Sequence, residues 1–169
     1  MGNAVKDNAW PPNIVVSRTR AGNPPPMQKF PVAASQVIYA GNPVELDASG
    51  ELLPSGVTPT TGVIAGVAME AVTTTAADEK TECNVALALP DTIFRMRGDA
   101  ATNTIDEGET CMINVAANVV SADINSSGGG TADLIRIVQK VRGDDETDAS
   151  APGRMDFVFN KTCWGQATP

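Results

Sequence analysis

The sequence predicts an all-β protein, a compact β-barrel or β-sandwich with an extended N-terminal arm. The chain has 169 residues, which is enough for one domain with a buried core. Short apolar runs rich in β-branched residues are separated by turn-forming residues, as in sheets joined by tight turns. Hydrophobic residues make up 42% of the chain but aromatic residues only 4%. Alanine and valine carry much of the hydrophobic share, and such small side chains suit thin sheets and closely packed subunits.

Residues 1–28 are predicted to form the arm, and residues 29–169 the β-barrel domain. Prolines at positions 11, 12 and 24–26 fix φ and keep the preceding residues extended, so the arm is not expected to be helical. The arm is locally basic, and its apolar stretch is expected to add to the edge of a neighbouring sheet when a partner binds. The residues assigned to this binding arm are Trp10, Ile14, Val15, Val16, Arg18 and Arg20. The alternative is a loose tail without a role.

The first strands of the folded part are predicted between residues 30 and 72. Residues 36–40 form a run rich in β-branched and aromatic residues that stops at a Gly-Asn-Pro turn. Residues 44–54 begin with alternating apolar and polar residues, continue through a second turn and resume as an apolar run, which is the pattern of a hairpin. Residues 62–72 are an apolar run interrupted by Gly62 and Gly66. This pattern predicts a buried, bent strand in which the glycines let another backbone come close.

Further short strands are predicted in the rest of the chain. They cover residues 82–90, 93–97, 111–115, 119–120, 134–141 and 155–160. Short strands separated by turn signals favour a sandwich or a barrel. Residues 98–169 either elaborate this barrel or form a second small β module.

The charge of the chain argues against two classes of partner. The formal net charge is -8 and the pI is about 4.4, so the surface as a whole repels nucleic acid and anionic membranes. No apolar run approaches the roughly 20 residues that a membrane span needs. We therefore expect neither a nucleic acid nor a membrane as partner.

The residue types also argue against an enzyme. The chain contains no histidine, which removes the usual general base and the commonest ligand of transition metals. Cys83, Cys111 and Cys163 are far apart in sequence and form no CxxC pair. Without a histidine to activate a thiol, we expect no catalytic cysteine and no cofactor.

One acidic segment resembles a cation site in composition. It contains Asp144, Asp145, Glu146 and Asp148, and clustered carboxylates are what Ca²⁺ needs. The segment lacks the glycine and the closing glutamate of an EF-hand, and charged runs between strands are usually solvated. We therefore expect no metal site.

A pattern of turns and strands marks the stretch from Lys29 to Pro54. It begins with Phe-Pro-Val-Ala-Ala, continues through a strand and a glycine turn, and ends with Val-Glu-Leu-Asp and Gly-Glu-Leu-Leu-Pro. The apolar run at residues 62–71 follows. This pattern, over residues 29–95, resembles the opening of the small bacteriophage capsid-decoration (head cement) proteins.

The resemblance implies a compact β-barrel, often a homotrimer, on the outer surface of a phage head. Its implied partners are the major capsid protein and other copies of the chain, and its implied location is the virion after synthesis in the host cytoplasm. In several such proteins an N-terminal arm becomes ordered only on binding. Residues 98–169 depart from the family's pattern, which leaves the number of domains open.

Three other classes of protein remain as alternatives. The first is a carbohydrate-binding or adhesin-type β-sandwich displayed on a virion or bacterial surface, for which the chain offers few aromatic side chains. The second is a glycosidase that uses carboxylates alone, and 20 acidic residues always provide candidate pairs. The third is a major capsid subunit, for which the chain is short.

Overall fold

The computed structural model describes residues 13–56, 64–76, 81–101, 106–116, 119–124, 134–141 and 152–166. The described part is all-β, as the sequence predicts. Its strands are β1 (Val15–Thr19), β2 (Met27–Pro31), β3 (Val37–Ile38), β4 (Pro43–Leu46), β5 (Leu52–Pro54), β6 (Ile64–Ala68), β7 (Val72–Thr73), β8 (Glu82–Leu87), β9 (Thr92–Ala101), β10 (Thr110–Ala116), β11 (Val119–Asp123), β12 (Ile135–Lys140), β13 (Pro152–Phe159), β14 (Lys161–Thr162) and β15 (Gly165–Gln166).

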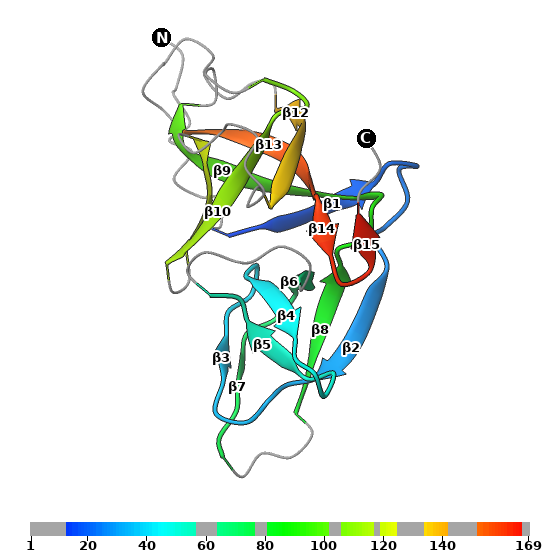
Figure 1. The fold of residues 1–169 in the computed structure, drawn as a ribbon, viewed down its shortest axis with the longest axis vertical. Coiled ribbons are helices and arrows are strands. Elements are labelled where there is room, and N and C mark those ends of the chain that lie inside the picture. The colour runs from blue at the N-terminus through cyan, green and yellow to red at the C-terminus, as the bar shows by residue number, and fades with distance from the viewer. Residues whose placement is uncertain are drawn as a thin grey trace, which may run out of the picture.

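Five strands close into a β-barrel in the upper half of the molecule (Figure 1). The order around the barrel is β9-β11-β10-β12-β13, and the pairing of β13 with β9 closes it. All neighbours are antiparallel except β11 and β9, which are parallel. β1 pairs with the first part of β9 and extends the sheet beyond the barrel.

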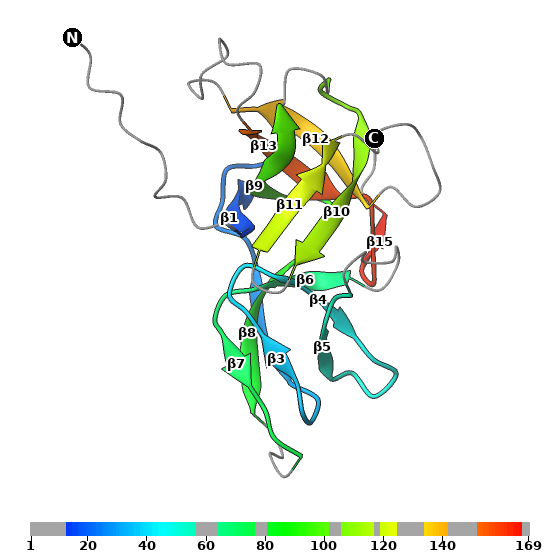
Figure 2. The ribbon, with the colours of Figure 1, turned by 90° about the vertical axis from the view of Figure 1, so that its left-hand side faces the viewer.

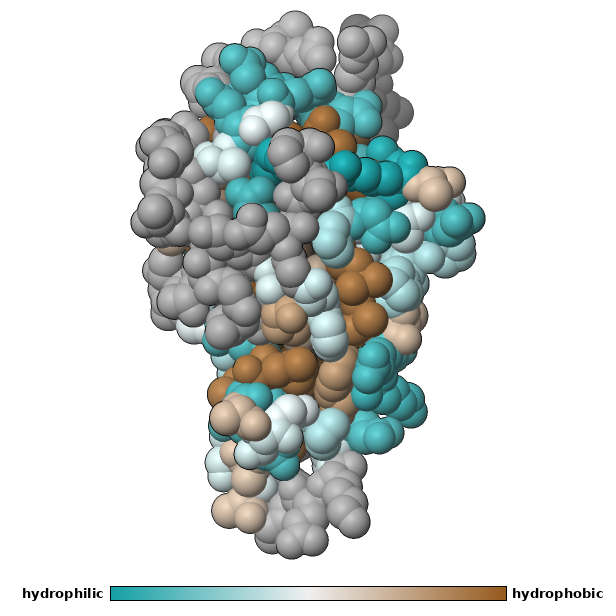
Figure 3. Space-filling model, turned by 45° about the vertical axis from the view of Figure 1, so that its right-hand side comes forward, coloured by the Kyte–Doolittle hydropathy of each residue, from teal (hydrophilic) through white to brown (hydrophobic). Residues whose placement is uncertain are grey.

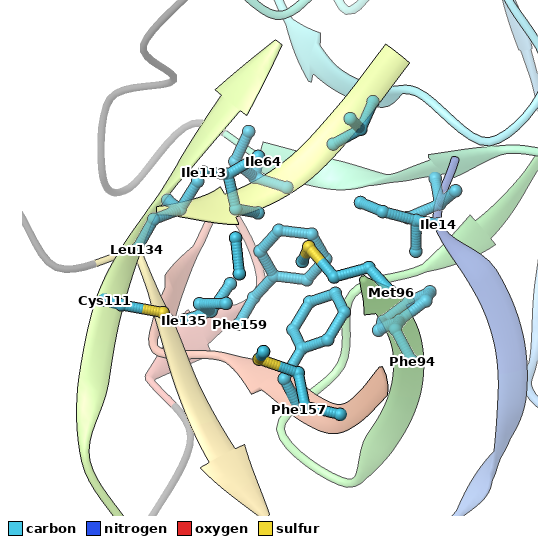
Figure 4. Packing of buried hydrophobic residues seen from close by; sticks show 14 of the residues in the cluster. Ile14, Ile64, Phe94, Met96, Cys111, Ile113, Leu134, Ile135, Phe157 and Phe159 are labelled. Atoms are coloured by element: carbon cyan, nitrogen blue, oxygen red, sulfur yellow. The ribbon is translucent and has the colours of Figure 1, made fainter. Parts of the chain in front are cut away.

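Aromatic side chains fill the barrel. Phe94 of β9 packs against Phe157 and Phe159 of β13 (Figure 4). The ring centroid of Phe94 is 5.8 Å from that of Phe157 and 5.3 Å from that of Phe159. Phe157 and Phe159 are in turn 5.4 Å apart in an edge-to-face arrangement. Each such pair adds about 0.5–1.5 kcal/mol to the stabilisation that burial provides. The barrel core therefore depends on the pairing of β9 with β13.

A smaller unit lies below the barrel (Figure 2). Its main sheet has the order β2-β8-β6-β4-β5, and β3 pairs with β7 beside it. β4 and β5 form the hairpin that the sequence predicts, with Gly50 at a φ of 81° in the turn between them. Its own core contains Phe30, Ile38, Val44 and Leu52.

The sheet of the smaller unit is buried on both faces where β6 and β8 pair. The pairing of β6 with β4 contains a register shift, so the side chains of β6 do not alternate strictly between the two faces. Ile64 and Val67 of β6 and Ala86 of β8 belong to the barrel core, whereas Ala65 and Val85 belong to the core of the smaller unit. One layer of backbone thus serves two cores, and the continuous apolar run of residues 64–68 is explained by this double burial.

A C-terminal hairpin fastens the barrel to β6. The backbone N–H of Cys163 donates to the carbonyl oxygen of Ile64 at 3.1 Å, and Nε1 of Trp164 donates to that of Ala65 at 2.6 Å. The Trp164 ring also packs on Phe30, with centroids 6.1 Å apart. β14 and β15, which the sequence did not predict, therefore link the two units at the same strand.

The N-terminal boundary of the fold differs from the prediction. Residues 13–28 were assigned to an arm outside the folded part, but β1 belongs to the sheet of the barrel and β2 to the smaller sheet. Ile14 is only 4% exposed and lies in the barrel core. The described chain is thus folded from Asn13 onward, because burial of its apolar residues and pairing with β9 and β8 hold it in place. Residues 1–12 lie outside the described residues.

The strand predictions for the rest of the chain are confirmed where the structure describes them. β8, β9, β10, β11, β12 and β13 each overlap a predicted run. The barrel uses strands between residues 92 and 159, and the smaller unit uses strands between residues 27 and 87. A boundary at Gly98 would divide β9, so the barrel begins before that residue.

The close approach predicted at Gly66 can be tested by substitution. A Cβ on Gly66 would overlap the backbone carbonyl oxygen of Ala86, whereas nothing lies within 4 Å of a Cβ on Gly56. We expect Gly66→Ala to lower the free energy of unfolding by about 1–3 kcal/mol or more, because backbone must move. Gly56→Ala, the matched control, should change it little. Urea denaturation measures both, and equal effects of the two substitutions would contradict the packing described for β6 and β8.

Candidate functional site

The residues assigned to the binding arm fall into three environments. Ile14 is in the barrel core, and its N–H donates to the carbonyl oxygen of Gly41 at 3.1 Å. Val16 is partly buried against the same core, and Val15 pairs with Arg95 of β9. The strand-like stretch is therefore added to the edge of a sheet, but that sheet is the protein's own.

Arg18 belongs to an ion-pair cluster on the outside of the barrel. Its Nη1 lies 3.1 Å from Oδ2 of Asp156, and Arg95 contacts the same carboxylate with Nε at 2.7 Å and Nη2 at 3.2 Å. The Asp156 side chain is 1% exposed, against 25% for Arg95 and 39% for Arg18. Asp156 is thus a buried acceptor that holds two guanidinium groups of β1 and β9 against β13.

Arg20 follows the end of β1 and is exposed. Its backbone N–H donates to the carbonyl oxygen of Asp91 at 2.8 Å, and a turn with Gly22 at a φ of 82° follows. Its guanidinium group makes no hydrogen bond or ion pair with the described residues. Trp10, the proposed anchor of the arm, lies outside the described residues.

A shallow, mostly apolar depression lies beside β1. It has a volume of about 230 Å³ and is lined by residues 13–16, 40–41 and 68–69. Asn13 donates from Nδ2 to the carbonyl oxygen of Ala40 at 2.7 Å, while its buried Oδ1 has no hydrogen-bond partner in the described part. The lining has no titratable side chain, so this depression suits an apolar group rather than acid–base chemistry.

The cysteines are placed as small hydrophobic residues rather than as nucleophiles. Cys83 and Cys111 are buried, Cys163 is exposed, and all three are free thiols. Burial, with a smaller effect of the Glu70 carboxylate, raises the pKa of Cys83 to about 11. Partial burial also raises the pKa of Cys163. Neither thiol is activated, since a raised pKa reduces the fraction of thiolate.

The described residues contain no group of three or more His, Cys, Asp or Glu side chains that could hold a metal ion. The acidic segment with Asp144, Asp145, Glu146 and Asp148 lies outside them. Within the same ranges there is also no helix long and apolar enough to cross a membrane. Figure 3 shows hydrophilic side chains over the barrel half of one face and a hydrophobic area nearer the middle of the molecule.

Comparison with known proteins gives no assignment. No protein-family model matches the chain, and no curated protein matches it. The candidate site therefore stands on its own geometry. Its most distinctive feature is the cluster of arginines around Asp156, of which the sequence had indicated only Arg18.

The Asp156 cluster can be tested by removing one partner at a time. Asp156→Asn should lower the free energy of unfolding by about 2 kcal/mol, because two guanidinium groups lose a buried anionic acceptor. Arg18→Ala should cost less than about 1 kcal/mol, because that side chain is 39% exposed and solvent screens its charge. Glu82→Gln, at an exposed ion pair with Lys29, is the control. Urea titration ranks the variants, and a loss for Arg18→Ala as large as that for Asp156→Asn would contradict this ranking.

The thiols should differ in their reactivity in the native protein. With a pKa of about 11, only about one Cys83 side chain in a thousand is a thiolate at about pH 8, and it is also buried. We expect a water-soluble disulfide reagent to label Cys163 first and to reach Cys83 and Cys111 only when denaturant is added. Mass spectrometry of the labelled peptides identifies the order. Early labelling of Cys83 would show that its environment is more open than described.

Proposed function

We propose that the protein is a structural virion protein that binds the outer surface of a bacteriophage head and stabilises the capsid lattice. The observation that carries the proposal is the resemblance of residues 29–95 to capsid-decoration proteins. Most residues of that pattern lie in the smaller unit, with β2 at its start, the β4–β5 hairpin and the buried β6, and its last residues begin β9 of the barrel. A β-barrel packed against this unit gives a rigid body suited to bridging subunits.

In this proposal the partners are the major capsid protein and further copies of the chain in a homotrimer. β2 and β5 end the smaller sheet, and a bridge between Val32 and Leu52 joins the chain after β2 to β5. Exposed apolar side chains on or near this unit include Met27, Val37, Tyr39 and Met69, and apolar side chains of this kind are common in interfaces. The role requires no enzymatic activity, cofactor or metal.

The alternative function, carbohydrate binding by an adhesin-type β-sandwich, has less support. Sugar sites usually stack the ligand on an exposed aromatic ring. Among the described aromatic side chains only Tyr39 and Trp164 are exposed. Trp164 is already engaged through Nε1 with Ala65 and through its ring with Phe30. Binding to a glycan array would favour this alternative over a capsid partner.

Sedimentation with capsids tests the proposed function. The full-length protein should sediment with expanded heads that lack it and should saturate at a fixed ratio to the capsid subunit. Removal of residues 1–12 spares every described strand, because β1 begins at Val15, and it should weaken binding without changing the melting temperature. Trp10→Ala should give a partial loss.

Two results would contradict these expectations. If the full-length protein stayed in the supernatant at every concentration, the capsid-decoration proposal would be wrong. If the protein without residues 1–12 bound as well as the full chain, the contact would have to be made by the folded part. Removal of residues 1–28 would not test the arm, because it deletes β1 and part of β2.

A further inference from the structure

The outer face of the barrel carries an unusual concentration of arginine. On β9, Phe94 and Met96 point into the core while Arg95 and Arg97 alternate with them. On β13, Arg154 and Asp156 alternate in the same way with core residues. Because the two strands are antiparallel neighbours, Arg97 lies opposite Arg154 and Arg95 lies opposite Asp156.

Two further strands extend this face. Arg18 reaches it from β1 through Asp156, and Arg136 of β12 lies opposite Val158 of β13. The arginine face therefore consists of Arg18, Arg95, Arg97, Arg136 and Arg154, which are five of the seven arginines in the chain. Four adjacent strands at about 4.8 Å spacing make it about 15 Å wide. It lies on a protein whose net charge is -8.

Among the described residues, most of these arginines already have partners. Asp156 is shared by Arg18 and Arg95. Near the end of β12, Oδ1 of Asp106 lies 3.8 Å from Nζ of Lys140. On β9, Oδ1 of Asp99 accepts a hydrogen bond from the backbone N–H of Ile124. Arg136 and Arg154 take part in further contacts, whereas the Arg97 side chain has no hydrogen bond or ion pair within the described residues. Arg97 is thus the cation of this face that is freest to meet a ligand.

Arg97 is therefore the side chain on which the inference rests, and across the strand pair it faces Arg154. A carboxylate placed over Arg97 would supply the partner that its side chain lacks among the described residues. The guanidinium group presents a planar fork that fits a carboxylate. We propose that the arginine face binds a carboxylate-rich surface of a partner protein. This inference rests on the proposed function, in which the partner is the capsid subunit.

Carboxylates of a protein fit this face better than the phosphates of a nucleic acid. A duplex is longer than the face, so its remaining phosphates would lie against the acidic remainder of the molecule, which repels them. A folded acidic surface can end where the face ends. The strands present a sheet face with side chains fixed by β-pairing, which favours a protein contact of complementary charge.

The experiment measures binding of the full-length protein to a poly-L-glutamate of about five residues, which is about as long as the face is wide. Ionic strength is low, and a longer DNA duplex is the second probe. Arg97→Glu is the test variant, and Lys29→Glu, at an exposed residue of β2, makes the same change in net charge away from the face. Arg97→Lys keeps the charge but loses the fork. Circular dichroism melting checks that each variant is folded.

We expect Arg97→Glu to weaken binding of poly-L-glutamate at least about tenfold and Arg97→Lys less, whereas Lys29→Glu should change it less than about twofold. Added salt should weaken binding of the wild-type protein.

Equal losses for Arg97→Glu and Lys29→Glu would overturn the proposal, because net charge alone would then govern binding. Tighter binding of the duplex than of poly-L-glutamate would also overturn it, as would an oligomeric state that Arg97→Glu abolishes, since a second copy would then occupy the face.

The same variants separate this inference from the proposed function when they are sedimented with capsids. Wild-type protein that binds capsids no better than Arg97→Glu would overturn the arginine face as the capsid contact and leave capsid decoration standing. Wild-type protein that binds poly-L-glutamate through Arg97 but does not sediment with capsids would overturn capsid decoration and leave the anion-binding face standing. A loss confined to Arg97→Glu in both assays supports both.

Discussion

The double burial of β6 is the constraint on which the rest of the structure depends. Its residues are divided between the core of the barrel and the core of the smaller unit, and Gly66 lets its backbone lie against β8 without a Cβ between them. The C-terminal hairpin is attached to the same strand through Ile64 and Ala65. Since neither unit can keep its core without this layer, the two form one body.

The local features of the fold follow from the sequence, but its long-range pairings do not. Alternation and turn residues predict the β4–β5 hairpin and most strands after residue 82, because these depend on neighbours in the chain. The prolines around β1 correctly exclude a helix, yet they do not reveal that Ile14 enters the barrel core or that Val15 pairs with Arg95. Such a pairing joins residues far apart in sequence, and only the packed structure decides it. Residues 13–28 were therefore mistaken for a free arm.

The candidate site shows the same division. Arg18 stands out in the sequence because it is basic in an acidic chain, and alternation around Phe94 and Met155 places neighbouring arginines on the polar side of their strands. The sequence does not show that β9 and β13 are neighbours, which is what brings Arg97 opposite Arg154 and Arg95 onto Asp156. A scattered set of cations in the sequence becomes one face only through the closure of the barrel.

Electron cryomicroscopy of phage heads incubated with the protein tests the account most directly. The account predicts density on the outer surface of the capsid into which the described barrel and smaller unit fit as one body, with the arginine face turned toward acidic residues of the capsid subunit. Heads without added density would contradict the capsid-decoration proposal. Added density in which the arginine face points into solvent would contradict the proposed contact.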